Sequence, residues 1–332
     1  MLDKAIASIE NLKVEFQTKD GPVVGVEDVS FQVFPGETVC IVGESGSGKS
    51  VSSLSLMRLV EFGGGEISGG RLLFDRRKDG EADLAETDQD LMRTIRGNEI
   101  GMIFQEPMTS LNPVYTTGEQ IAEVLRRHQG LGRKAAWEQA VELLDAVGIP
   151  NARTRAEAYP HQMSGGQRQR VMIASALACR PKALIADEPT TPLDVTVQAQ
   201  IFDLLHDLRR QTNTAMILIT HDMGVVAEMA ERMIVMYAGR KVEEGPVADV
   251  IATPRHPYTR GLISCVPHLT DHLTEDRPEL TEIPGIVPSL NTFGQNNCLF
   301  AARCSLVSDQ CRSARPDDTA LGTQQVACWH AD

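Results

Sequence analysis

A short apolar segment followed by a glycine-rich loop constrains the fold of this chain more than any other feature. Residues 38–42 read Thr-Val-Cys-Ile-Val, and residues 43–50 read Gly-Glu-Ser-Gly-Ser-Gly-Lys-Ser. The first stretch predicts a buried strand, and the residues after the loop predict a helix from about Lys49 to Val60. A strand, a glycine loop and a helix in this order are typical of a phosphate-binding unit in an α/β fold.

The loop matches the pattern G-x-x-x-x-G-K-[ST], which assigns a chemical role to each part of it. Backbone N–H groups surround phosphate oxygens, the Lys49 ammonium neutralises the β- and γ-phosphate charge, and the Ser50 hydroxyl reaches Mg²⁺. An ordinary glycine-rich turn is the alternative, and the strand–loop–helix setting argues against it. The predicted ATP-binding residues are Gly43, Glu44, Ser45, Gly46, Ser47, Gly48, Lys49 and Ser50.

Strand and helix patterns alternate along the rest of the chain, which predicts a mainly parallel sheet covered on both faces. An extended segment with a register break near Glu27-Asp28 is expected at 24–33, and residues 107–178 read as helical. Proline, glycine and irregular pieces dominate after residue 255, so we expect one domain at 1–255 and a C-terminal extension at 256–332. Further strands are predicted at 71–74, 100–104, 183–186, 215–220 and 232–237, with a helix at 197–210 and a solvated loop at 75–90 that leads into another helix.

Two adjacent carboxylates follow one of the predicted strands. Leu184, Ile185 and Ala186 are succeeded directly by Asp187 and Glu188. Side chains alternate along a strand, so one carboxylate can approach Mg²⁺ while its neighbour faces the water that attacks the γ-phosphate. Acidic pairs are common on protein surfaces, but after a phosphate-binding loop we assign Asp187 to the metal and Glu188 to water activation.

Composition limits the possible partners. The 332 residues carry a formal net charge of −13, which argues against a protein that mainly grips nucleic acid. No apolar run approaches the roughly 18 residues that span a bilayer, and the first residues lack a secretory h-region. We therefore expect a cytoplasmic chain that can still dock on a membrane protein.

A second loop motif leads to a family. The turn Ser164-Gly165-Gly166-Gln167 opens a predicted helix just before the carboxylate strand. It resembles the signature sequence of ABC ATPases, whose helix N-terminus offers free amides and a positive dipole end to a γ-phosphate. Helix capping by Ser164 is the simpler interpretation, and the resemblance implies both. In that family the signature of one subunit caps the ATP held by the loop of another.

The remaining elements of the family occur in order. The resemblance implies that Phe16 stacks on adenine, that Gln105 reaches Mg²⁺ and the attacking water, and that His221 contacts the γ-phosphate. A core position is the alternative for Phe16. Asp194 resembles the D-loop aspartate at the subunit junction. Pro192 departs from the pattern, because the family usually has a small residue there, and proline restricts Thr191 and removes an N–H.

A longer resemblance covers nearly the whole chain. Residues 104–113, the segment Arg255–Thr259 and the cysteines of the tail resemble the ATP-binding subunits of bacterial dipeptide and oligopeptide importers. This implies a P-loop ABC-type ATPase core with an inserted helical subdomain and a small irregular C-terminal extension. The groove for the permease's coupling helix is expected near Gln105 to Thr117.

The resemblance also implies the assembly. Hydrolysis of ATP would energise uptake through two integral-membrane permease subunits, at the cytoplasmic face of the inner membrane. A second ATP-binding subunit, identical or paralogous, would complete the nucleotide sites, and an extracytoplasmic solute-binding protein would deliver the solute. Di- and oligopeptides are the expected cargo, with glutathione or nickel complexes as the alternative. A soluble ABC ATPase acting on DNA or ribosomes is disfavoured by the single phosphate loop and the absence of a heptad arm.

Four of the seven cysteines crowd into the end of the chain: Cys298, Cys304, Cys311 and Cys328. In a reducing cytoplasm such a group indicates a metal or iron–sulfur site more than a disulfide framework. Their spacing leaves zinc and a [4Fe–4S] cluster both open, although zinc usually takes closer cysteine pairs. The family resemblance favours the [4Fe–4S] cluster.

Overall fold

The computed structural model describes residues 4–106, 110–190, 193–265, 282–289, 292–293 and 296–331. The chain divides into two compact units, which are treated separately below. Unit 1 comprises Met1–Ser8, Gln32–Thr38 and Leu72–Ile219, and unit 2 comprises Ile9–Phe31, Val39–Arg71 and Thr220–Asp332. Within the described residues, no helix is both long and apolar enough to cross a bilayer.

Unit 1 contains a parallel sheet with strand order β6-β7-β8, which confirms three predicted strands. The strands are β6 (Ile100–Ile103), β7 (Ala183–Asp187) and β8 (Ala215–Ile219). Every residue of the three is buried, as expected where helices cover both faces of a parallel sheet. The central strand β7 ends at Asp187, whose partner in β8 is Ile219, so the acidic pair lies at the carboxyl edge.

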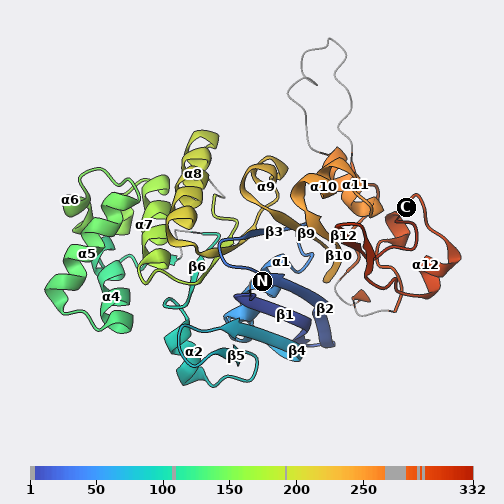
Figure 1. Ribbon diagram of the computed structural model, residues 1–332, viewed down its shortest axis with the longest axis horizontal. Coiled ribbons are helices and arrows are strands. Elements are labelled where there is room, and N and C mark those ends of the chain that lie inside the picture. Colours follow the sequence, from blue (N-terminus) through green and yellow to red (C-terminus); the bar gives the residue numbers. More distant parts are fainter. Residues whose placement is uncertain are drawn as a thin grey trace, which may run out of the picture. The chain divides into compact units, whose positions relative to one another are not determined.

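Helices make up the middle of unit 1. They are α4 (Thr117–Gln129), α5 (Arg133–Ala146), α6 (Ala152–Ala156), the short η2 (Pro160–Gln162) and α7 (Gly165–Leu177), with α8 (Val195–Thr212) joining β7 to β8. The α4–α7 group is drawn in green to yellow-green in Figure 1 and contains fully buried Ile121, Leu125 and Leu144. A Cβ at Gly118 would lie 2.8 Å from the Ala156 side chain, so glycine permits the close approach of α4 to α6.

The segment before β6 differs from the sequence prediction. The sequence predicts a solvated loop at 75–90, but β5 (Glu81–Asp83) lies within it and pairs antiparallel with the end of β4 (Gly65–Asp75). The helix predicted after this segment is present as α2 (Gln89–Ile95), which Asp88 caps by accepting from the Leu91 amide at 2.7 Å. The sequence does not predict this charged hairpin, because β5 is short and shows no alternation of apolar and polar residues.

Unit 2 carries the phosphate-loop strand β3 (Thr38–Val42), which runs parallel to β9 (Arg232–Tyr237). Beyond β9 the strands are antiparallel, in the order β10 (Arg240–Pro246), β12 (Gln324–Val326) and β11 (Thr319–Leu321). A second sheet has β1 (Ala7–Thr18) between β2 (Gly21–Val33) and β4. The helical elements are α1 (Lys49–Leu56), η1 (Val60–Gly63), α9 (Met223–Met229), α10 (Val247–Ala252), α11 (Pro257–Ser264), η5 (Ala301–Arg303) and α12 (Asp309–Ser313).

Unit 2 confirms one predicted irregularity and corrects two predicted elements. Asp28 has a φ of 57°, which gives β2 its expected register break. The helix after the phosphate loop ends at Leu56 instead of residue 60, because Arg58 adopts a left-handed φ of 50°. The tail, expected to be irregular, instead adds β12 to the edge of β10, where Val326 pairs with Glu243 and is fully buried.

Candidate functional site

The phosphate loop is folded tightly behind β3. Gly43 has a φ of 147°, and a Cβ there would lie 2.2 Å from the carbonyl oxygen of Met236 in β9. Gly48 has a φ of 96°, and its Cβ would lie 2.6 Å from a methyl carbon of Val26. Gly43 is therefore required because a side chain would clash with the main chain of β9. Gly48 is required because a side chain would clash with buried Val26.

Polar groups of this loop suit a bound polyphosphate. The ammonium of Lys49 is buried and donates to the carbonyl oxygens of Gly43 at 2.8 Å and Glu44 at 2.9 Å. The hydroxyl of Ser47 is buried and has no hydrogen-bond partner among the described residues. Helix α1 begins directly behind the loop without a side-chain cap on Gly48. The loop thus combines a buried cation, an unpaired hydroxyl and a helix N-terminus, which fits phosphate chemistry.

Phe16 and His221 are the other predicted nucleotide contacts in unit 2. The ring of Phe16 is half-buried over Gly25 and Gly65, where added Cβ atoms would lie 2.6 Å and 2.9 Å from ring carbons. His221 is exposed and follows β8 at the start of α9, whose N-cap is the neighbouring Asp222. Their proposed contacts with adenine and γ-phosphate remain predictions.

In unit 1 the structure brings two predicted catalytic side chains together. The Gln105 side-chain amide donates to a carboxylate oxygen of Glu188 at 2.8 Å, although 83 positions separate the two residues. The Glu188 amide donates to the Ile219 carbonyl at 3.0 Å, and the residue takes a left-handed φ of 43°. Asp187, one position earlier, lies at the end of β7 and is only 7% exposed. The acidic pair therefore has one enclosed and one more accessible carboxylate.

The predicted signature forms a reciprocal helix cap. The Ser164 hydroxyl accepts from the Gln167 amide at 3.3 Å, and the Gln167 side-chain oxygen accepts from the Ser164 amide at 3.2 Å. The capping interpretation of Ser164 is therefore confirmed. Ser164 and Gly165 are exposed, so the start of α7 stays accessible while it is capped.

The residues predicted as the signature and as the D-loop lie side by side within unit 1. A Cβ at Gly166 would lie 2.9 Å from a methyl carbon of Val197, and one at Gly165 would lie 3.6 Å from Leu193. Asp194 caps α8, because its carboxylate accepts from the Val197 amide at 3.0 Å. Pro192, the residue that departs from the family pattern, lies outside the described residues.

The four tail cysteines line one small cavity in unit 2, together with Phe300, Trp329 and His330. All four are free thiols. Burial raises the pKa of Cys298 to about 11 and also raises the pKa values of Cys304 and Cys328. The described residues nevertheless contain no group of three or more His, Cys, Asp or Glu side chains placed to hold a metal ion. The cavity brings the cysteines into one neighbourhood without forming a ligand set.

Polar groups contact the sulfur atoms of the tail cysteines. The Leu306 amide lies 3.3 Å from the Cys304 sulfur, and the His330 amide lies 3.3 Å from the Cys328 sulfur. Ser308 Oγ lies 3.3 Å from the sulfur of Cys311. A backbone hydrogen bond from Phe300 lowers the pKa of Cys298, although burial outweighs it. Donors aimed at sulfur stabilise thiolates, which is the form that binds metals.

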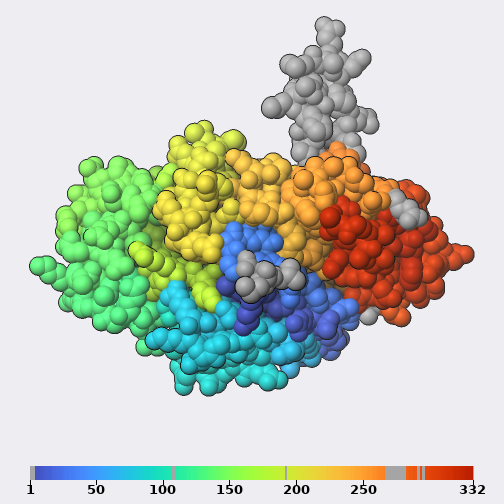
Figure 2. Space-filling model, viewed as in Figure 1, coloured from blue at the N-terminus to red at the C-terminus, as the bar shows by residue number. Residues whose placement is uncertain are grey.

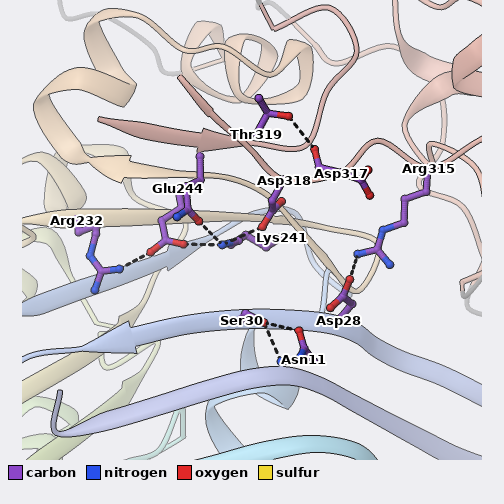
Figure 3. A network of polar contacts seen from close by, with 11 residues as sticks. Asn11, Asp28, Ser30, Arg232, Lys241, Glu244, Arg315, Asp317, Asp318 and Thr319 are labelled. Atoms are coloured by element: carbon purple, nitrogen blue, oxygen red, sulfur yellow. Dashed lines mark hydrogen bonds and ion pairs between the residues drawn. The ribbon is translucent and has the colours of Figure 1, made fainter. Parts of the chain in front are cut away.

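Polar contacts also attach the extension to the strands of unit 2 (Figure 3). Arg315 Nη2 lies 2.8 Å from the Asp28 carboxylate of β2. Lys241 of β10 lies 3.2 Å from Asp318 and 2.7 Å from Glu244. Red residues of the extension form a continuous surface in Figure 2. The tail is thus held by charge pairs as well as by the β12–β10 pairing.

Two contacts to the phosphate loop were missed by sequence reasoning. Arg303 forms an ion pair with Glu44, and the Tyr258 hydroxyl accepts from the Glu44 amide. In the sequence, Tyr258 stands out only as part of the family-like segment Arg255–Thr259, and no motif marks Arg303. No local pattern could reveal these pairs, because 214 and 259 positions separate the partners.

Comparison with known proteins identifies two regions of the chain. A family model described as ABC transporter matches residues 26–191, and one described as Oligopeptide/dipeptide transporter, C-terminal region, matches residues 242–311. A putative peptide import ATP-binding protein of Brucella abortus is 54% identical over 318 residues, covering 95% of this chain and 94% of the relative. The oligopeptide transport ATP-binding protein AppD of Bacillus subtilis is 48% identical over 311 residues, covering 94% and 92%.

Among solved structures, the fold is similar to that of a dimeric post-hydrolysis state of the ATP-binding cassette MJ0796 bound to ADP and Pi. The TM-score is 0.62 at 28% identity, and the match covers 73% of this chain and 98% of that one. The predicted α/β fold of the ABC ATPase type is thereby confirmed. The chain belongs to the ABC transporter family, as an ATP-binding subunit of the oligopeptide and dipeptide transporter type.

Proposed function

We propose that this chain hydrolyses ATP to energise the import of di- and oligopeptides through a membrane permease. The observation that carries the proposal is the hydrogen bond from Gln105 to Glu188 at the carboxyl end of β7, beside buried Asp187. This arrangement supplies an accessible base, a group that orients it and an enclosed metal ligand. The match of residues 242–311 to the peptide-transporter region supports the choice of cargo.

Each predicted residue has a role in the hydrolysis. Lys49 neutralises the phosphates, and Phe16 stacks on the adenine. Ser50, Asp187 and Gln105 are the residues that would hold Mg²⁺, and the ion would supply neutralisation of phosphate charge. Glu188 accepts a proton from the water whose oxygen bonds to the γ-phosphorus, while the bond to the β–γ bridging oxygen breaks. His221 and the loop amides stabilise the charge on the transferred phosphoryl group.

A second ATP-binding subunit completes each site in this proposal. Residues Ser164, Gly165, Gly166 and Gln167 bind the ATP of the partner, and Asp194 lies at the junction. The exposure of Ser164 and Gly165 supports this role, because a helix start that receives a neighbour's phosphate must be reachable. The partner can be an identical chain or a paralogue.

We place the permease contact at the exposed residues 112–115, within the region after Gln105, of which residues 107–109 lie outside the described part of the chain. Val114 is 71% exposed and Tyr115 is 54% exposed, and both belong to the region expected to receive the coupling helix. The Gln120 side chain holds this loop by donating to the carbonyls of Asn112 at 3.0 Å and Tyr115 at 3.1 Å. An apolar surface on a braced loop suits docking of a permease helix at the cytoplasmic face of the membrane.

An extracytoplasmic solute-binding protein delivers the cargo in this proposal, so the permease and that protein select the solute. Glutathione or a nickel complex is the alternative cargo. Co-expression with the permease and binding protein, followed by uptake of labelled peptides, glutathione and nickel in proteoliposomes, tests the assignment. ATP-dependent uptake of peptide alone supports it, whereas hydrolysis that never depends on any permease contradicts it.

For the tail we propose one [4Fe–4S] cluster held by Cys298, Cys304, Cys311 and Cys328, with Zn²⁺ as the alternative. The proposal is supported by the cavity that all four thiols line and by polar groups 3.3 Å from the sulfurs of Cys304, Cys311 and Cys328, although the described residues form no ligand set as they stand. When bound, the cluster supplies four metal–thiolate bonds that clamp the tail. Metal binding requires the thiols to lose their protons and move into a common ligand geometry.

A further inference from the structure

The C-terminal extension holds the phosphate loop at Glu44. Arg303 donates from Nη1 to one carboxylate oxygen of Glu44 at 2.7 Å and from Nη2 to the other at 3.0 Å. The main-chain amide of Glu44 donates to the Tyr258 hydroxyl at 2.8 Å. Glu44 is therefore fixed at its side chain and at its backbone by two residues that follow position 255. Paired, parallel hydrogen bonds of this kind restrict both distance and orientation.

Arg303 is itself immobilised by its surroundings. Its Nε donates to the Pro284 carbonyl at 2.9 Å, and Nη2 donates to the Ile283 carbonyl at 3.1 Å. The guanidinium carbon lies 5.9 Å from the ring centre of Phe300, and the side chain is only 4% exposed. A buried guanidinium with these contacts is a rigid support, unlike a surface ion pair.

The pair matters electrostatically because of where Glu44 lies. Glu44 belongs to the loop assigned to the ATP phosphates, so its unpaired carboxylate would repel a polyphosphate. Arg303 neutralises that charge. The carbonyl of Glu44 is also an acceptor for Lys49, at 2.9 Å, so a displaced Glu44 would disturb the lysine as well.

The same arginine is tied to the cysteine-lined cavity. Arg303 ends η5, which lies between Cys298 and Cys304. The Ala301 amide donates to the Cys298 carbonyl at 3.0 Å, and the Arg303 amide donates to the Phe300 carbonyl at 2.9 Å. The backbone that presents the guanidinium to Glu44 is thus continuous with two of the four cysteines.

We propose that Arg303 is a positioning residue of the nucleotide site, which holds and neutralises Glu44 and so makes ATP affinity depend on the cysteine-containing extension. The proposal rests on the assignment of Gly43–Ser50 to ATP binding. It gives the extension a role in the ATPase cycle beyond stability. It also predicts that loss of Arg303 weakens the binding of ATP more than that of ADP, because ATP carries one more phosphate group.

A double-mutant cycle on the full chain tests the proposal, with Mg-ATP and Mg-ADP binding measured by calorimetry. Arg303→Met should weaken ATP binding about tenfold and ADP binding less, because the uncompensated carboxylate repels the longer polyphosphate more. Adding Glu44→Gln should restore most of the ATP affinity, since the repelling charge is gone. Unchanged ATP affinity in Arg303→Met, or a double variant as weak as Arg303→Met, overturns the proposal.

Two further variants separate the possible failures. Arg315→Met removes another ion pair of the extension, with Asp28, and should leave ATP affinity within about twofold of wild type. An equal loss in Arg315→Met would show general loosening of the extension and reject the specific role of Arg303. Lys49→Ala should lose ATP binding whatever Arg303 does. Normal ATP affinity in Lys49→Ala would instead reject the phosphate-loop assignment on which the proposal rests.

Discussion

Gln105 and Glu188 meet at 2.8 Å, with the glutamine amide donating to the carboxylate. The contact fixes the orientation of the proposed base. Gln105→Ala should therefore reduce the rate of ATP hydrolysis, about tenfold, while ATP affinity changes little. Steady-state kinetics of the assembled transporter measure both parameters. A loss confined to ATP affinity would contradict the orienting role.

Glu188→Gln keeps the size of the side chain and removes the base. We expect ATP to bind normally while hydrolysis falls by about 100-fold or more. Single-turnover hydrolysis with radiolabelled ATP measures the chemical step directly. Hydrolysis within a few-fold of wild type would assign water activation to another group.

Ser164 combines a structural and a proposed functional role, which two substitutions distinguish. Ser164→Ala removes the cap of α7 and should lower the free energy of unfolding by about 1 kcal/mol. Ser164→Arg should leave ATP binding by its own chain intact. The bulk and charge of the arginine should nevertheless prevent the ATP-dependent association of two subunits. Sedimentation velocity with Glu188→Gln as the background reports association. Normal association of the arginine variant would refute the composite site.

The cysteine-lined cavity predicts a metal-dependent extension. Anaerobically purified protein should contain four irons and four sulfides per chain, and Cys311→Ser should lose both and melt at a lower temperature. Cys265→Ser is the matched control, because Cys265 is a half-buried free thiol that does not line the cavity. One zinc per chain without sulfide would replace the cluster, and the absence of any metal would reject the site.

His256 predicts acid sensitivity of the fold. Burial, and to a smaller extent Arg260, lowers the pKa of His256 to about 3, and its Nδ1 accepts from the Tyr258 amide at 3.0 Å. Below the unfolded value of about 6.5 the unfolded chain gains a proton that the folded chain excludes, so stability is lost as the pH falls from 6.5 toward 3. From pH 7 to pH 5 the loss should be about 2 kcal/mol.

His256→Asn checks this origin, because asparagine can still cap α11 but does not titrate. Urea unfolding at pH 7 and pH 5 should show a smaller pH dependence in the variant than in wild type. The Glu243 carboxylate accepts from the main-chain amide of residue 256 and is present in both proteins. Its contribution to the pH dependence therefore largely cancels when the variant is compared with wild type. Equal pH dependence in the two proteins would exclude His256 as the source.

Short sequence motifs were sufficient to predict many elements of the fold and of the candidate site. The strand at 38–42, the loop Gly43–Ser50, the acidic end of β7 and the cap of α7 by Ser164 follow from contiguous residues, because hydrogen bonds and φ angles within a few residues decide such elements. The break of β2 at Asp28 was also predictable. Helix α1 ended early because a left-handed residue is not encoded by apolar periodicity.

Tertiary structure alone decided the contacts between distant segments. The Gln105–Glu188 bond, the approach of Gly166 to Val197 and the pairing of β12 with β10 each join residues that no local pattern relates. The clearest case is Glu44 with Arg303, 259 positions apart. Such pairs form because the packing of many side chains holds the two backbones at a fixed distance. The attraction between complementary charged side chains becomes stronger once burial has excluded water from around them.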